Sequence, residues 1–316
     1  MNRIEPDIST LDEAARAGWL YYVGQMTQDQ IATELGVSRQ RAQRLVAKAM
    51  AEGLVHVRLN HPIAQCLALE AALTRRFDLG HCRVAPSLGA AADPAQSTAA
   101  AAAELLEHFL ARPAPQVIAV GTGRSLSAMV GELSAQFTER HSIVSLVGNI
   151  APDGSASLFD VIMRLADKLR AQHYPMLVPV ISETIEERAL FRSLRPVQAV
   201  IKLAQSADVT FVGVGQMGDD APIYKDGFVT REQLADMQAN GAAGEIVSGV
   251  YNRDGVYIES PIIARLCGIR VDPGRGKPVI GVASGLTKVT AIRAALKGRI
   301  LNGLVTDERT AEALLA

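Results

Sequence analysis

The chain has 316 residues, of which 48% are hydrophobic and 21% charged, and its 32 lysines and arginines nearly balance 33 aspartates and glutamates. This composition is typical of a folded globular protein and excludes a largely disordered chain. Any contact with nucleic acid is therefore expected to be confined to a patch, because a protein that coats nucleic acid non-specifically is usually strongly basic. No uncharged apolar run reaches the roughly 18 residues that span a bilayer. Three cysteines without CxxC spacing predict reduced thiols in a cytoplasmic protein.

Residues 1–60 are expected to form a small helical DNA-binding domain. Residues 11–24 carry apolar side chains at helical spacing. Thr27 can cap a second helix, since its hydroxyl can accept a free amide of the first turn. Gly36 permits a sharp turn, and Ser38 can cap a third helix that runs to about Glu52, where Gly53 stops it. The order of these signals predicts a helix-turn-helix.

Positive charge is concentrated in the third helix and the segment after it. Between Ser38 and Leu59 the sequence has five Lys or Arg and one Glu, a local balance of +5 − 1 = +4. The alternating LVHVRL stretch, residues 54–59, predicts a strand that would form the wing of a winged helix-turn-helix. Arg and Gln can form paired hydrogen bonds with guanine and adenine in the major groove. We therefore expect operator DNA to contact Thr27, Gln28, Ser38, Arg39, Gln40, Arg41, Gln43, Arg44 and Lys48. The alternative is a solvated helical hairpin that mediates protein contacts.

Residues 61–316 predict a doubly wound, mostly parallel α/β domain that binds an effector and forms oligomers. A helix is expected over residues 63–77, and Asp93 followed by Pro94 marks the start of another. From residue 116 onward, apolar strand-like runs alternate with amphipathic helices, a pattern typical of a parallel sheet covered on both faces. Ligands of such sheets bind at the carboxyl ends of the strands. The expected strands are VIAVG, SIVSLVG, MLVPVI, VTFVGVG, EIVSGVY, PVIGVA and LVT.

The loop after the first of these strands has the composition of an anion site. Its glycines let the backbone approach a ligand closely, its hydroxyls and arginine add donors, and a following helix would present free amides. Phosphate is the expected ligand, although a purely structural glycine turn is the alternative. The loop matches neither the dinucleotide-binding pattern, because Leu126 replaces the third glycine, nor the GxxxxGK[ST] phosphate loop. Its residues are Gly121, Thr122, Gly123, Arg124 and Ser125.

Polar residues follow other strands as well. Glu245 and Lys288 are candidates for effector contacts, with a strand-edge carboxylate and a solvated lysine as the alternatives. Their shared position at carboxyl ends favours one pocket. The full set of such candidates is Asn149, Glu183, Gln216, Glu245 and Lys288.

Catalytic and metal-binding motifs are not found in the sequence. There is no HExxH, GxSxG or clustered His/Cys pattern, so we expect no catalytic residue, no metal and no cofactor. Asp153, Glu183 and Glu245 could serve as acids or bases, but they suggest no coherent pair. A sugar-phosphate isomerase or deaminase-like enzyme is the alternative function.

The segment YYVGQMTQDQIATELGVSRQRAQRLVAKAMAEGLVHV resembles the DNA-binding head of SorC/DeoR-type sugar-responsive bacterial transcriptional regulators. The motifs GTGRSL, FVGVGQMG, NGAAGEI and GVASGLTKVTAIRAALKGRILNGLVTDERTAEALL resemble their sugar-binding domain. This resemblance implies a body related to sugar-phosphate isomerase, deaminase and CoA-transferase folds. It also implies a tetramer or dimer on operator DNA that controls a carbohydrate or polyol catabolic operon, with a sugar or sugar phosphate as effector.

Carried over by position, the resemblance assigns residues 121–125 to a phosphate loop and places Lys288 near the effector's phosphate. Arg124 and Lys288 favour a phosphorylated effector, with a free sugar or polyol as the alternative. Glu245 stands where the family usually has Asp, so its longer side chain is expected to alter hydroxyl recognition and effector size. Ala42 stands where a branched residue is usual in the recognition helix.

Overall fold

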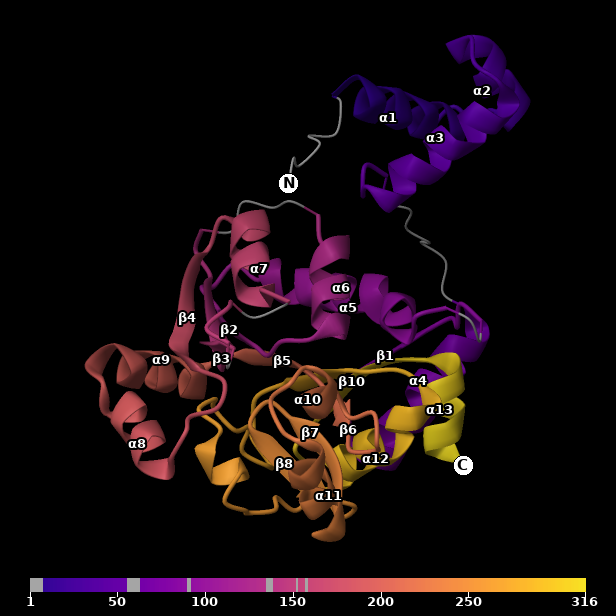
Figure 1. Ribbon diagram of the computed structural model, residues 1–316. Helices are drawn as coiled ribbons and strands as arrows, with labels where there is room; N and C mark the ends of the chain where they lie inside the picture. Colours follow the sequence, from indigo (N-terminus) through magenta and orange to yellow (C-terminus); the bar gives the residue numbers. More distant parts are fainter. Residues whose placement is uncertain (1–7, 56–62, 90–91, 135–138, 152, 157–158) are drawn as a thin grey trace. The chain divides into compact units, whose positions relative to one another are not determined.

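The computed structural model describes residues 8–55, 63–89, 92–134, 139–151, 153–156 and 159–316. The chain divides into two compact units, Met1–His61 and Pro62–Ala316, which we call the head and the body (Figure 1). None of the helices in the described ranges combines the length and apolar content that a membrane crossing requires.

The described part of the head contains three helices around a small apolar core. Small alanines let the helices approach closely, and Ile31, Ala42 and Ala49 are fully buried between them. The expected wing strand at residues 54–59 lies mostly outside the described residues. The helices are α1 (Ile8–Tyr22), α2 (Gln28–Leu35) and α3 (Arg39–Ala51).

Local capping sets the turn between α2 and α3. The Thr27 amide donates to Gln30 Oε1 at 2.8 Å, and the Gln30 amide donates to Thr27 Oγ1 at 3.4 Å, which is a reciprocal capping box. Gly36 ends α2 with φ +63°, a conformation that glycine adopts without strain. The Arg41 amide then donates to Ser38 Oγ at 3.2 Å and begins α3. The predicted caps and turn are present as expected from the sequence.

The body is built on a seven-stranded sheet in which every pair of neighbours is parallel. The strand order β1-β10-β9-β5-β2-β3-β4 confirms the predicted doubly wound α/β class. The strand HCRVA was not predicted; it forms β1 at one edge. The strands are β1 (His81–Ala85), β2 (Val117–Val120), β3 (Ser142–Ile150), β4 (Gln172–Pro179), β5 (Val209–Gly213), β9 (Val279–Val282) and β10 (Gly303–Asp307).

Helices cover both faces of this sheet because its strands are apolar on both sides. In β2, Ile118 and Val120 belong to one buried cluster and Ala119 to the other, as strand geometry requires. The first cluster includes α5 (Pro94–Leu110), α6 (Arg124–Glu132) and α7 (Val161–Leu169). The second includes α4 (Ala64–Phe77), α9 (Arg195–Ser206), α12 (Val289–Lys297) and α13 (Glu308–Leu315). A further helix, α8 (Ile185–Ser193), precedes α9.

A second, antiparallel sheet lies in the body (Figure 1). Two stretches that the sequence predicts as single strands are each divided in two. VTFVGVG yields β5 and β6, and EIVSGVY yields β7 and β8 because Val247 turns the chain with φ +58°. The elements here are β6 (Gly215–Gln216), β7 (Ala242–Ile246), β8 (Gly249–Asn252), α10 (Pro222–Lys225) and α11 (Arg231–Ala239).

Early and late parts of the body are joined to each other. Strand β1 pairs with β10 from His81 opposite Gly303 to Ala85 opposite Asp307. Glu308 of α13 accepts hydrogen bonds from the Cys66 thiol at 3.5 Å and from the Ser87 amide at 3.1 Å. The sheet therefore becomes complete only when elements from both ends of the body are in place.

Candidate functional site

The outward face of α3 is the candidate DNA-binding surface. Gln40, Gln43 and Arg44 are exposed and lie opposite the buried stripe of this helix. Within the described part of the chain, no hydrogen bond or ion pair holds these three side chains. They are therefore free to meet base edges or phosphates.

The other predicted DNA contacts already have partners in the head or are less exposed. Arg39 Nε lies 3.4 Å from Asp29 Oδ1, and Arg41 Nη2 lies 2.8 Å from Glu13 Oε2. Exposed ion pairs of this kind stabilise by about 0–1 kcal/mol, so phosphates can compete for both arginines. The Thr27 and Ser38 hydroxyls are used as helix caps, while Gln28 and Lys48 are half-buried.

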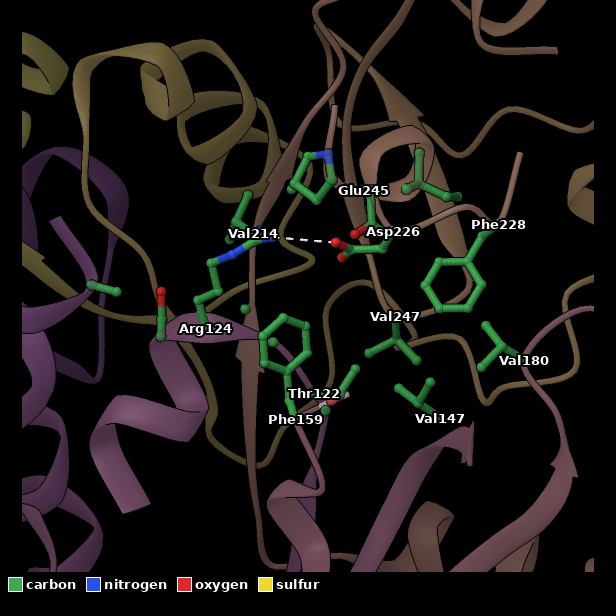
Figure 2. Close-up of a pocket in the computed structure, with 18 of the residues that line it drawn as sticks. Thr122, Arg124, Val147, Phe159, Val180, Val214, Asp226, Phe228, Glu245 and Val247 are labelled. Carbon is green, nitrogen blue, oxygen red and sulfur yellow. Dashed lines mark hydrogen bonds and ion pairs between the residues drawn. The ribbon is translucent and has the colours of Figure 1, made fainter. Parts of the chain in front are cut away.

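The second candidate site is a cavity of about 490 Å³ in the body. It opens where β2, β3, β5 and β9 end, as a parallel sheet predicts. Residues 93–95 at the start of α5, residues 222–228 around α10, and the β7 strand complete its wall. Figure 2 shows the side chains that line it.

Seven of the ten predicted effector residues line this cavity. They are Gly121, Thr122, Gly123, Arg124, Ser125, Glu245 and Lys288. Asp153 also lines it, whereas Glu183 does not, so the three carboxylates that an enzyme could have used are not gathered in one place.

The other three predicted residues do not line the cavity. Glu183 is exposed. Gln216 Nε2 donates to Asp220 Oδ1 at 2.7 Å and so braces its own turn. Asn149 Oδ1 is buried without a hydrogen-bond partner among the described residues. A strand-end position fixes the edge of the sheet on which a residue lies but not the direction of its side chain.

The glycine loop after β2 presents donors to the cavity. Gly123 has φ +115°, which side chains rarely adopt, and it leads directly into α6. Ser125 is buried in the first turn of that helix, where backbone amides have no partner within the helix. Thr122 Oγ1 is buried and has no hydrogen-bond partner among the described residues. The loop can thus bind an oxygen of a ligand, whether phosphate or hydroxyl.

Glu245 and Lys288 form the polar floor of the cavity. Gly215 pairs with Glu245 in the small sheet, and a Cβ at Gly215 would lie 2.6 Å from Glu245 Oε1, so glycine makes room for the carboxylate. Burial raises the pKa of Glu245 to about 7; nearby Lys288 lowers it and Asp226 raises it further. Burial lowers the pKa of Lys288, against the opposing effect of Glu245. Glu245 therefore changes protonation near neutral pH.

Asp226 and the apolar walls were not predicted from the sequence. Arg124 Nη2 lies 3.2 Å from Asp226 Oδ1, and the Arg124 guanidinium lies 5.5 Å from the Phe159 ring centre (Figure 2). Phe228 and Val247 add apolar surface. Asp226 follows the short helix α10, and no motif marks it in the sequence. Among the described residues, no group of three His, Cys, Asp or Glu side chains could hold a metal ion.

The fold and the cavity define a protein that joins a helix-turn-helix head to a ligand-binding α/β body. The family model described as "Putative sugar-binding domain" matches residues 61–316, and the model of the MarR family matches residues 14–60. The chain belongs to the SorC/DeoR-type sugar-responsive bacterial transcriptional regulators, a family of regulators and not of enzymes.

Three relatives illustrate this membership. The chain is 34% identical to the erythritol catabolism regulatory protein EryD of Brucella abortus, over 96% of each chain. It is 33% identical to the transcriptional regulator LsrR of Klebsiella pneumoniae, over 96% of this chain and 92% of that protein. The crystal structure of the full-length sorbitol operon regulator SorC from Klebsiella pneumoniae has a TM-score of 0.72 and 25% identity, and the match covers 98% of this chain and 100% of that one.

Proposed function

We propose that this regulator controls a carbohydrate or polyol catabolic operon and that its effector binds in the cavity of the body. The observation that carries the proposal is the convergence of seven predicted effector residues on one cavity. Relatives whose names refer to erythritol catabolism and to a sorbitol operon support a polyol or sugar as the effector class.

The head binds the operator DNA. Helix α3 is the recognition helix, and its Gln40, Gln43 and Arg44 contact operator bases or phosphates. Arg39 and Arg41 contact the DNA backbone. A symmetric pair of heads reads two half-sites about one helical turn apart, so the protein acts as a dimer or tetramer. Its place of action is the cytoplasm.

The effector acts by binding two states of the protein with different affinities. Only such a difference can shift the population toward the state that binds, or releases, the operator. The loop at residues 121–125 is an element through which a ligand could favour one state, because it joins β2 to α6 and faces the cavity.

A mobility-shift titration tests this function. The full chain is titrated against the DNA upstream of its own gene, with four- to six-carbon polyols, sugars and their monophosphates added in turn. We expect specific binding that at least one compound strengthens or weakens, and Lys288→Met should abolish that response without weakening DNA binding. Specific binding that no such compound alters would contradict the assigned effector class.

A further inference from the structure

The arginine of the glycine loop is already paired with a carboxylate inside the cavity. Figure 2 shows the Arg124 guanidinium directed at Asp226, and the two are joined by a contact of 3.2 Å. The Asp226 side chain is only 13% exposed, compared with 55% for Arg124. Among the described residues, Asp226 forms an ion pair with Arg124 only. The arginine is therefore held by a largely buried anion and does not present a free positive charge to a ligand.

Carboxyl groups outnumber cationic groups in the lining of the cavity. Its charged lining consists of two cations, Arg124 and Lys288, and four carboxylates, Asp93, Asp153, Asp226 and Glu245. Two of the carboxylates are engaged locally: Asp93 Oδ1 accepts from the Ala95 amide at 3.0 Å, and Asp153 Oδ1 accepts from the Ser155 hydroxyl at 2.6 Å. Asp226 and Glu245 remain on the inner wall beside the two cations.

We propose that Asp226 is a selectivity residue, which neutralises Arg124 so that the cavity selects an uncharged polyhydroxylated effector over its phosphate ester. The inference rests on the proposed function, since it names the effector class of the same cavity. It differs from the expectation drawn from Arg124 and Lys288 alone, which favours a phosphorylated effector.

A phosphate dianion is disfavoured here for two physical reasons. A phosphate that bound Arg124 would have to compete with Asp226 and would leave this largely buried carboxylate without its ion-pair partner, which is unfavourable. It would also lie close to the negative charge of Asp226, and like charges repel at short range.

An uncharged polyol avoids both penalties and still finds partners. Carboxylates accept hydrogen bonds from ligand hydroxyls, and the loop amides and the buried Thr122 Oγ1 can pair with hydroxyl oxygens and hydrogens. Phe159 and Phe228 line the same space and can cover the carbon chain.

Inorganic phosphate is the probe that tests Asp226 directly. Its binding to the full chain is measured by calorimetry or thermal shift, at constant ionic strength maintained with chloride, for the parent protein and Asp226→Asn. Asp254→Asn is the matched control, because Asp254 pairs with Lys297 at 2.6 Å and both side chains are exposed. We expect Asp226→Asn to bind phosphate at least about tenfold more tightly than the parent and the control, because it frees Arg124 and removes a negative charge.

Adding Arg124→Ala to Asp226→Asn should abolish that gain, which would show that the freed arginine binds the phosphate. If Asp226→Asn does not fold, Asp226→Ser takes its place in the comparison. In the parent protein, a four- to six-carbon polyol should bind more tightly than its monophosphate.

Two results would overturn the proposal. One is that the parent binds phosphate as tightly as Asp226→Asn; the other is that a monophosphate binds the parent more tightly than its free polyol. Both are readouts of ligand selectivity. The proposed function would instead be refuted if none of these compounds changed DNA binding by the parent protein. The two failures are therefore distinguishable.

Discussion

We predict that Glu245 makes the stability of this protein depend on pH. In the folded body burial raises the pKa of Glu245 from its usual 4.5 to about 7. The folded state therefore binds a proton that the unfolded state has already released between these pH values. Stability from this group is fully present below pH 4.5 and is lost as pH rises through 7.

The size of the effect follows from the difference between the two pKa values. That difference corresponds to about 3 kcal/mol. Because water still reaches part of the side chain, we expect about 2 kcal/mol in practice. Glu245→Gln removes this ionisable group, so the variant should be more stable than the parent by about 2 kcal/mol at pH 8 and by about 0.8 kcal/mol or less at pH 5.

Urea unfolding followed by far-UV circular dichroism from pH 5 to pH 8 measures this difference. The head is followed separately through the fluorescence of Trp19, which is the single tryptophan of the chain. Glu259→Gln is a control, because Glu259 is an exposed carboxylate of the body that pairs with Arg270. Parallel pH profiles for the parent and Glu245→Gln would refute the argument that this carboxylate is buried with a raised pKa.

Three further predictions concern the head and the sheet. Arg44→Ala should weaken operator binding by about tenfold and reduce the salt dependence by about one phosphate contact, as measured by mobility shift. Arg41→Ala should weaken operator binding less, because Arg41 is paired with Glu13. Equal losses of affinity would contradict this distinction. Thr27→Ala removes the capping box and should lower the stability of the head by about 1 kcal/mol in thermal unfolding, whereas an unchanged transition would show that the cap is dispensable. Gly148→Ala would place a methyl group against the Pro179 carbonyl, so the body should lose about 1–3 kcal/mol in urea unfolding unless β4 moves aside freely.

Local signals in the sequence were sufficient for the caps and the sheet class. The side chains of Thr27, Ser38 and Asp93 each accept a hydrogen bond from a backbone amide in the first turn of the helix that follows. Such caps are predictable because they depend only on the next few residues. The parallel class follows from apolar runs that must be buried on both faces.

Features that depend on distant contacts were not predictable in the same way. Strand β1 has five residues, two of them polar, and it is a strand because β10 lies beside it. Asp226 acquires its role only when α10 folds over the cavity and meets Arg124, which lies about a hundred residues earlier. Gln216 shows a different limit, because its side chain bonds within its own turn, to Asp220 four residues along, and not toward the cavity.

The position of β10 has a consequence for the order in which the protein is made. This strand comes late in the sequence, yet it lies inside the sheet between β1 and β9, and α13 after it contacts α4. The head contains only residues from the first part of the chain, so it can complete its fold during synthesis, while the body waits for β10. A nascent or truncated chain can therefore carry a finished recognition helix without a functional sensor.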